Sequence, residues 1–145
     1  MSKLLFKELS DQVLGAAFTV HSTLGPGLLE SLYQKAMCIE LKYRHISYEC
    51  QSPYEVYYRN ESIGVFYADL VIEKKIIVEL KAVKLLQELM EAQTINYLKI
   101  SHIAVGYLIN FNSTSLVWKD FTEGFKAFGF IANMKLFKKK IGTPY

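Results

Sequence analysis

The stretch that constrains the fold most runs from Ala68 to Ala82 and has the sequence ADLVIEKKIIVELKA. Two apolar segments flank the charged residues 73–75, a pattern that predicts a tight turn between two strands. The second strand, residues 76–81, is mostly apolar, which indicates a largely buried position in a sheet. Charged side chains there are costly unless they are paired or bind a metal. The acidic residues of this stretch are therefore the first candidates for a functional site.

Asp69 lies near the end of the first of these strands, and Glu79 and Lys81 lie near the end of the second. Residues two apart in a strand face the same side, and the turn returns the second strand beside Asp69. The two carboxylates and the ammonium are expected to converge, with an exposed, salt-bridged strand face as the alternative. Two unit charges about 4 Å apart interact by about 4 kcal/mol at an effective dielectric constant of about 20. Such a pair shifts a pKa or recruits a cation, and oxygen ligands without His or Cys favour Mg²⁺ or Mn²⁺ over Zn²⁺.

The N-terminal third of the chain repeats apolar residues at helical spacing. This spacing predicts one helix over residues 4–24 and a second over residues 28–43, separated by the sequence GPG at residues 25–27. Residues 44–53 are predicted to form a connection, with a short extended piece at residues 46–49.

Strands and one further helix fill the rest of the predicted domain. The first strand of the hairpin covers residues 63–70 and is preceded by a strand at 56–58, so the three strands predict an antiparallel meander. Residues 85–100 return to helical spacing. Residues 103–111 predict a buried central strand and residues 115–120 a short one after it. The predicted fold is α/β in the order α-α-β-β-β-α-β-β, with three layers: a mixed four- or five-stranded sheet and helices on both faces.

The overall composition limits the classes of function. The chain has 145 residues, enough for one domain, and 51% hydrophobic and 14% aromatic residues, which excludes a disordered chain. A net charge of +3 permits nucleic-acid binding without requiring it. The sequence has no phosphate-binding loop, dinucleotide-binding glycine motif or nucleophile elbow. His21, His45 and His102 lack the spacing of metal ligands, which disfavours a zinc site.

The cysteines and the N-terminus indicate an ordinary cytoplasmic protein. Cys38 and Cys50 lack the spacing of a metal or redox motif, and Cys38 is predicted to be a buried free thiol. Residues 1–10 lack the apolar core of a signal peptide, and the apolar stretch at residues 13–20 is too short to span a membrane. We therefore expect a cytoplasmic protein without membrane contacts.

The C-terminal end differs from the rest of the chain. No linker or repeat divides residues 1–120, which predict one domain, whereas residues 121–145 combine an aromatic stripe with a basic end. The stripe suits a short amphipathic helix that packs on the domain or extends from it. The basic end either frays into solvent or contacts phosphates, and the aromatic stripe could instead form a homodimer interface. The residues concerned are Phe121, Phe125, Phe128, Lys135, Lys138, Lys139 and Lys140.

The acidic strand pair resembles a known catalytic core. Asp69, a β-turn, the sequence ELK at residues 79–81, a helix and a further strand together resemble the PD-(D/E)XK phosphodiesterase core. The proline that precedes the first aspartate in that superfamily is absent, because Ala68 stands there. The resemblance implies a restriction-endonuclease-like core.

The start of the second helix adds to this resemblance. Gly27, Glu30 and Tyr33 resemble the signature of the GxxExxY family, which is assigned to the same superfamily. They step by three residues and so share one face near the start of the helix. Two further segments are similar to that family, and the resemblance covers residues 21–120. These segments are LGPGLLES at residues 24–31 and LINFN at residues 108–112.

The resemblance implies a metal site and roles for its residues. Asp69 and Glu79 would hold Mg²⁺ or Mn²⁺, with the Leu80 carbonyl and with Glu30 directly or through water. Lys81 would position or help deprotonate the attacking water and stabilise the transition state. For Glu30, a glutamate that complements the helix dipole is a strong alternative.

The helix after the acidic strands carries a second motif. Gln93 and Tyr97 resemble the Gln-x-x-x-Tyr motif of nucleases linked to recombination helicases, where it contacts DNA near the metal. The alternative is an exposed glutamine and a half-buried core tyrosine, and Tyr33 is a third predicted contact for nucleic acid. The expected function is metal-dependent hydrolysis of phosphodiester bonds in nucleic acid, DNA rather than RNA. The main alternative is a non-catalytic nuclease-fold module that binds nucleic acid or a protein partner.

Overall fold

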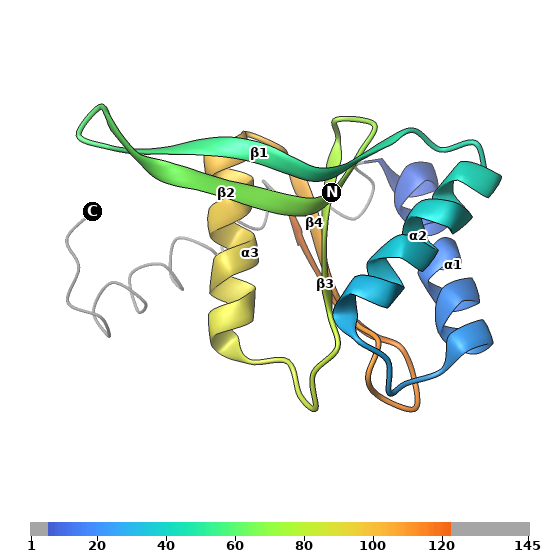
Figure 1. Ribbon diagram of the computed structural model, residues 1–145. Coiled ribbons are helices and arrows are strands. Elements are labelled where there is room, and N and C mark those ends of the chain that lie inside the picture. Colours follow the sequence, from blue (N-terminus) through green and yellow to red (C-terminus); the bar gives the residue numbers. More distant parts are fainter. Residues whose placement is uncertain (1–5, 123–145) are drawn as a thin grey trace.

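The computed structural model describes residues 6–122, which form three helices and five strands (Figure 1). Their order along the chain confirms the predicted α-α-β-β-β-α-β-β arrangement. The elements are α1 (Lys7–Leu24), α2 (Glu30–Tyr43), β1 (Tyr48–Tyr58), β2 (Glu61–Ile72), β3 (Ile76–Lys81), α3 (Glu88–Ser101), β4 (Val105–Asn110) and β5 (Val117–Thr122). Within these residues no helix is long and apolar enough to cross a membrane.

The strands form one mixed sheet in the order β1-β2-β3-β4-β5. β1, β2 and β3 make the predicted antiparallel meander. β3 and β4 are parallel, and the connection between them contains α3, as a parallel pair requires a long crossover. β5 then pairs antiparallel with β4 and is the last strand on that side of the sheet. The sequence of β4 is apolar up to its last residue, Asn110, and this matches its position, because all six of its residues are buried.

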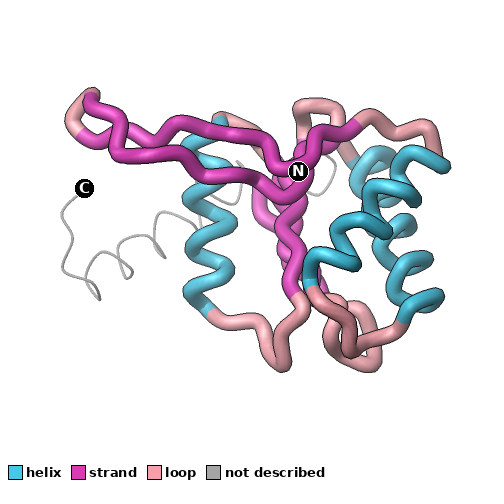
Figure 2. Tube along the Cα trace, viewed as in Figure 1, coloured by secondary structure: helices cyan, strands magenta, loops and turns pink. Residues whose placement is uncertain are grey.

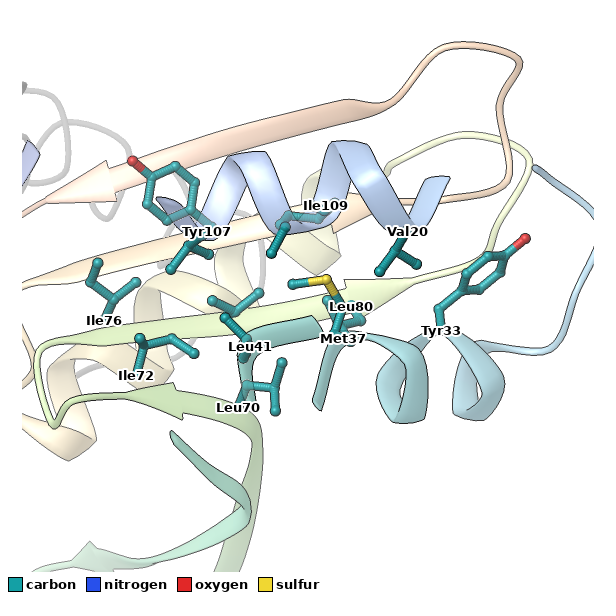
Figure 3. Packing of buried hydrophobic residues seen from close by; sticks show 14 of the residues in the cluster. Val20, Tyr33, Met37, Leu41, Leu70, Ile72, Ile76, Leu80, Tyr107 and Ile109 are labelled. Atoms are coloured by element: carbon teal, nitrogen blue, oxygen red, sulfur yellow. The ribbon is translucent and has the colours of Figure 1, made fainter. Parts of the chain in front are cut away.

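Different helices cover the two faces of the sheet (Figure 2). On one face α1 and α2 pack, and Met37 and Leu41 of α2 lie in the same buried cluster as Leu80 of β3 (Figure 3). On the other face, Ile77 of β3 packs in a cluster with Leu98 of α3. Each such side chain contributes about 1.5–3 kcal/mol when fully buried. The three-layer α/β prediction is confirmed, and both faces of β3 are covered by helices.

The prediction for residues 44–53 was wrong in its second half. β1 begins at Tyr48, where it pairs with Ile72 of β2, so most of the expected connection is strand. The polar sequence at residues 49–52 gives little local strand signal. The long β2 strand supplies backbone hydrogen-bond partners along its length, and this tertiary pairing overrides the local preference.

The predicted helix at the C-terminal end was wrong at its first residue. Phe121 lies in β5, pairs with Gly106 and is 5% exposed. The free edge of β4 offers a complete row of backbone partners, which favours a strand over a single helical turn. β5 also continues past the predicted boundary at residue 120. Phe125, Phe128 and the basic end lie outside the described residues.

Candidate active site

β2 and β3 separate at Asp69 and Glu79. Their paired register runs from Ile72 opposite Ile76 to Leu70 opposite Val78, and the next position would set Asp69 opposite Glu79. There the Asp69 backbone N–H donates to Glu79 Oε2 at 3.0 Å, and the Leu80 N–H donates to Asp69 Oδ2 at 2.9 Å. The side-chain carboxylates thus replace the backbone ladder at this point. We call this arrangement of Asp69, Glu79 and Leu80 the β2–β3 fork.

The two carboxyl groups of the fork share a poorly solvated site. Glu79 is 5% exposed, and burial raises the pKa of its carboxyl to about 8, with the charge of Asp69 acting in the same direction. Burial also raises the pKa of Asp69, against the lowering effects of the Leu80 N–H, Gln51 and Lys81. Two carboxylates placed this close cannot both ionise without a compensating charge. The fork therefore holds a proton or requires a cation.

Lys81 lies at the end of β3, half-buried and two residues beyond Glu79. Its positive charge lowers the pKa of Asp69, Glu79 and Glu30 alike. Among residues 6–122 no ion pair within 4.0 Å joins Lys81 to a carboxylate. Its ammonium thus acts on the acidic groups without being paired directly to one of them.

Glu30 is the first residue of α2 and lies within electrostatic range of the fork. Partial desolvation raises the pKa of its carboxyl; Lys81 opposes that shift and Asp69 adds to it. Across the described chain, however, no three His, Cys, Asp or Glu side chains are close enough together to hold a metal ion. Glu30 is therefore near the fork without completing a cluster of three ligands.

α3 brings Tyr97 to the same place. The Tyr97 ring stacks on Phe66 of β2, with centroids 3.9 Å apart and planes 4° from parallel. Burial raises the pKa of Tyr97, and the charges of Glu79 and then Asp69 raise it further, so its phenol lies within electrostatic range of both carboxylates. Gln93 lies exposed one helical turn earlier. Tyr97 thus lies near the fork, with Gln93 on the same side of α3 facing solvent.

Tyr33 has a different environment from the one predicted. It is fully buried and stacks on Phe111, and its hydroxyl donates to the Gly25 carbonyl at 2.6 Å. The same hydroxyl accepts a hydrogen bond from the Leu28 N–H at 3.2 Å. The Tyr33 side chain is used to fasten the loop before α2, so it is not available to nucleic acid and the predicted contact is not supported.

The glycine of the same motif also serves the loop. Gly27 has φ 102°, a conformation that side chains rarely adopt, and its N–H donates to Asn112 Oδ1 at 3.0 Å. The spacing Gly27, Glu30, Tyr33 therefore builds a tied loop that sets Glu30 at the start of α2. Glu30 is the residue of this motif that interacts with the fork, because the charge of Asp69 raises the pKa of its carboxyl.

Two polar residues, one that binds the fork and one that binds the chain just after β3, were not predicted from the sequence. Gln51 of β1 donates to Asp69 Oδ1 at 3.3 Å, and it was hidden in the predicted connection at residues 44–53. Asn110 is 2% exposed and hydrogen-bonds both the N–H and the carbonyl of Val83, just after β3. A lone amide at the end of a wholly apolar strand was the available signal for Asn110. Gln51 offered no such signal.

Comparison with known proteins agrees with this geometry. A family model described as the PD-(D/E)XK nuclease superfamily matches residues 7–121. The chain belongs to this superfamily. Its nucleases generally use divalent metal ions and act on nucleic acid. No curated protein matches the chain.

One similar solved structure is described as "Crystal structure of SSO0001". It shares 19% sequence identity with this chain, with a TM-score of 0.46. The similarity covers 64% of this chain and 49% of the other, so this chain spans about half the length of that relative.

The raised pKa of Glu79 predicts that the metal-free protein loses stability as pH rises. Its carboxyl titrates near pH 4.5 when unfolded and near pH 8 when folded, so the folded state binds more protons between these values. The stabilisation is complete below pH 4.5 and is lost as pH rises through 8. At about 1.4 kcal/mol per pKa unit, the total loss of unfolding free energy should be about 5 kcal/mol. Denaturation in EDTA at several pH values measures it.

Glu79→Gln should reduce the slope of unfolding free energy against pH, because the amide does not titrate. Glu61→Gln, at the exposed first position of β2, is the matched control and should leave the slope unchanged. Equal slopes in wild type and Glu79→Gln would show that Glu79 does not carry the proton.

Proposed function

We propose that this protein is a metal-dependent nuclease that hydrolyses phosphodiester bonds in DNA. The observation that carries the proposal is the fork, where Asp69 and Glu79 lie together with Lys81 two residues further along β3. Membership in the PD-(D/E)XK superfamily supports a nuclease activity. DNA is preferred because Gln93 and Tyr97 resemble a DNA-contacting motif and lie on the helix beside the fork.

The fork fits a divalent cation. Its donors are two carboxylates whose pKa values are raised by desolvation, and in Glu79 also by the charge of Asp69. A bound cation offsets both effects. Mg²⁺ commonly binds through one or two carboxylates and keeps several waters, so a cluster of three acidic residues is not required. Asp69 and Glu79 would hold Mg²⁺ or Mn²⁺, with the Leu80 carbonyl, and Glu30 would act through a bound water. When bound, the cation supplies charge compensation for the phosphate and lowers the pKa of water.

The chain's own residues then have separate tasks. Lys81 holds the attacking water by a hydrogen bond, or accepts its proton when Lys81 is in the neutral amine form. The ammonium charge stabilises the negative charge that grows on the phosphate oxygens. Asp69 and Glu79 are oriented in advance by the backbone N–H groups of the fork. Gln93 and Tyr97 orient the strand to be cut. Because Tyr97 is fixed by stacking on Phe66, little side-chain entropy is lost when it does so.

The GxxExxY branch is the proposed position within the superfamily. Its three signature residues have distinct uses here: Gly27 makes the turn, Tyr33 fastens it and Glu30 is left beside the acidic pair. The LINFN segment supports the same assignment, because Asn112 binds the N–H of Gly27 and so links the two similar segments.

A binding module without chemistry is the second candidate. One observation favours it: each carboxylate of the fork already accepts a backbone hydrogen bond, and Glu79 has a pKa of about 8. A protonated Glu79 could serve as a structural link between β2 and β3 alone. In that case the protein would bind nucleic acid or a protein partner and not cut.

A cleavage assay separates the two candidates. Single- and double-stranded DNA and RNA are incubated with Mg²⁺, Mn²⁺ or EDTA, using wild type and Asp69→Asn. We expect cleavage of DNA by wild type with either ion, and none with EDTA or Asp69→Asn. Binding of DNA without any cleavage would favour the binding module.

The melting temperature provides an independent test of metal binding. Millimolar Mg²⁺ or Mn²⁺ should raise it in wild type, because a ligand that binds only the native state stabilises that state by mass action. Asp69→Asn should lose most of this gain, because it removes an anionic ligand. A wild-type melting temperature that responds to neither ion contradicts the proposed metal site.

A further inference from the structure

Gln51 has an unusual backbone conformation for a residue inside a strand. Its φ is 52°, in the left-handed region, although it lies within β1. Other non-glycine residues with such a backbone among residues 6–122 lie in turns or at helix ends, such as Arg59, Glu73 and His102. The left-handed conformation costs about 1–2 kcal/mol for a residue with a Cβ. Gln51 is exposed, so packing of its side chain does not compensate this cost.

The strained residue stands opposite the fork. β1 and β2 pair at Cys50 with Leu70 and again at Ser52 with Ala68, whereas the intervening Gln51 and Asp69 are unpaired. The Asp69 N–H donates instead to Glu79 in the fork. The backbone distortion in β1 therefore coincides with the position where β2 delivers its carboxylate.

The Gln51 side chain connects this distortion to the carboxylate. Its amide nitrogen donates to Asp69 Oδ1 at 3.3 Å and to Gln34 Oε1 at 3.0 Å. An ionised carboxylate accepts hydrogen bonds only, so the nitrogen of the amide must face it. Gln34 is held in turn, because its own amide donates to Cys50 Sγ at 2.9 Å. The Gln51 amide nitrogen thus links Asp69 of β2 to Gln34 of α2.

Both oxygens of Asp69 are therefore fixed by separate donors. Leu80 N–H binds Oδ2 and Gln51 binds Oδ1, which prevents rotation of the carboxylate about its χ2 bond. Each carboxylate oxygen can accept two partners, so a lone pair on Oδ1 stays available to a ligand. A metal ligand is commonly oriented by a second hydrogen-bonding residue of this kind.

We propose that Gln51 is a positioning residue that orients the Asp69 carboxylate for metal binding, with Gln34 as its anchor. This inference rests on the proposed function, since it assigns Asp69 as a metal ligand. It gives a reason for the strained backbone of an exposed strand residue: in this conformation the Gln51 amide hydrogen-bonds both Asp69 and Gln34.

Mn²⁺ binding to two Gln51 variants tests the proposal. Gln51→Leu removes the amide and keeps the strain, whereas Gln51→Gly removes the amide and relieves the strain. Gln51→Gly should therefore melt at a higher temperature than Gln51→Leu. Both should bind Mn²⁺ about 10- to 100-fold more weakly than wild type, as measured by calorimetric titration well below the melting temperature. Arg59→Gly, at an exposed turn residue with φ 48°, is the matched control and should bind Mn²⁺ normally.

The outcomes separate this inference from the proposed function. Wild type that binds Mn²⁺ while both Gln51 variants bind it equally well overturns the positioning role and leaves the nuclease proposal standing. Affinity that follows melting temperature, with Gln51→Gly near wild type, also overturns it, since a purely structural role has that signature. Wild type without any Mn²⁺ binding contradicts the metal site itself and both proposals with it.

Discussion

Replacement of Lys81 by alanine should reduce metal-dependent DNA cleavage about a hundred- to a thousandfold, with nearly unchanged DNA affinity. Lys81 has no ion pair within 4.0 Å among the described residues, so its ammonium remains available to a water or a phosphate oxygen. An interaction made only in the transition state changes turnover and leaves ground-state binding almost unaffected.

The structural alternative for Lys81 makes a different prediction. If Lys81 only neutralises Glu79, its loss leaves a buried carboxylate unpaired and destabilises the fold. This effect should be small at neutral pH in metal-free protein, because Glu79 has a pKa of about 8 and is largely protonated there. Cleavage rate, DNA affinity and melting temperature should therefore be measured on one Lys81→Ala preparation.

Lys84→Ala is the matched control for Lys81. Lys84 is exposed and lies just beyond the end of β3, so its removal changes the net charge equally. It should leave the cleavage rate close to that of wild type. A folded Lys81→Ala protein that cleaves as fast as Lys84→Ala would exclude a catalytic role for Lys81.

Asn110→Ala should lower the free energy of unfolding by about 3–5 kcal/mol. The Asn110 side chain accepts from the Val83 N–H at 3.0 Å and donates to the Val83 carbonyl at 2.9 Å. It also accepts from the Asn112 N–H at 3.3 Å. Alanine would leave these backbone groups without their partner, and each unsatisfied buried group costs about 1–3 kcal/mol. Urea denaturation monitored by circular dichroism measures the change.

Asn110 also lies beside β3, because it pairs in register with Lys81. Its loss should therefore loosen the chain that leaves β3 and reduce cleavage as well. Asn112→Ala is the control: Asn112 is less buried, and its side chain satisfies a single N–H of Gly27, so we expect about 1 kcal/mol. Equal destabilisation by the two substitutions would contradict the proposed role of the Val83 bonds.

Local patterns in the sequence were sufficient to predict most of the helices and strands. The apolar periodicity of α1, α2 and α3 and the alternation in β2 were predicted because each depends on residues close together in the chain. The short charged turn at residues 73–75 likewise brought Asp69 beside Glu79, since a tight antiparallel turn determines which residues of its two strands face each other.

Tertiary structure decided the features that depend on distant partners. β1 is a strand at Tyr48 because β2 lies beside it, and Phe121 is in a strand because β4 has an edge to pair. Tyr33 is buried because Phe111 and the Gly25 carbonyl meet it from other parts of the chain. No spacing in the sequence encodes such contacts.

The same division applies to the site. The sequence by itself determined that Asp69 of β2 lies opposite Glu79 of β3, with Lys81 two residues further along β3, because strand geometry is regular. Only the tertiary structure decided that Gln51 binds Asp69 and that the pKa of Glu79 rises to about 8. A pKa depends on burial and on charges in three dimensions, and a hydrogen bond between side chains 18 residues apart depends on how two strands and a helix pack.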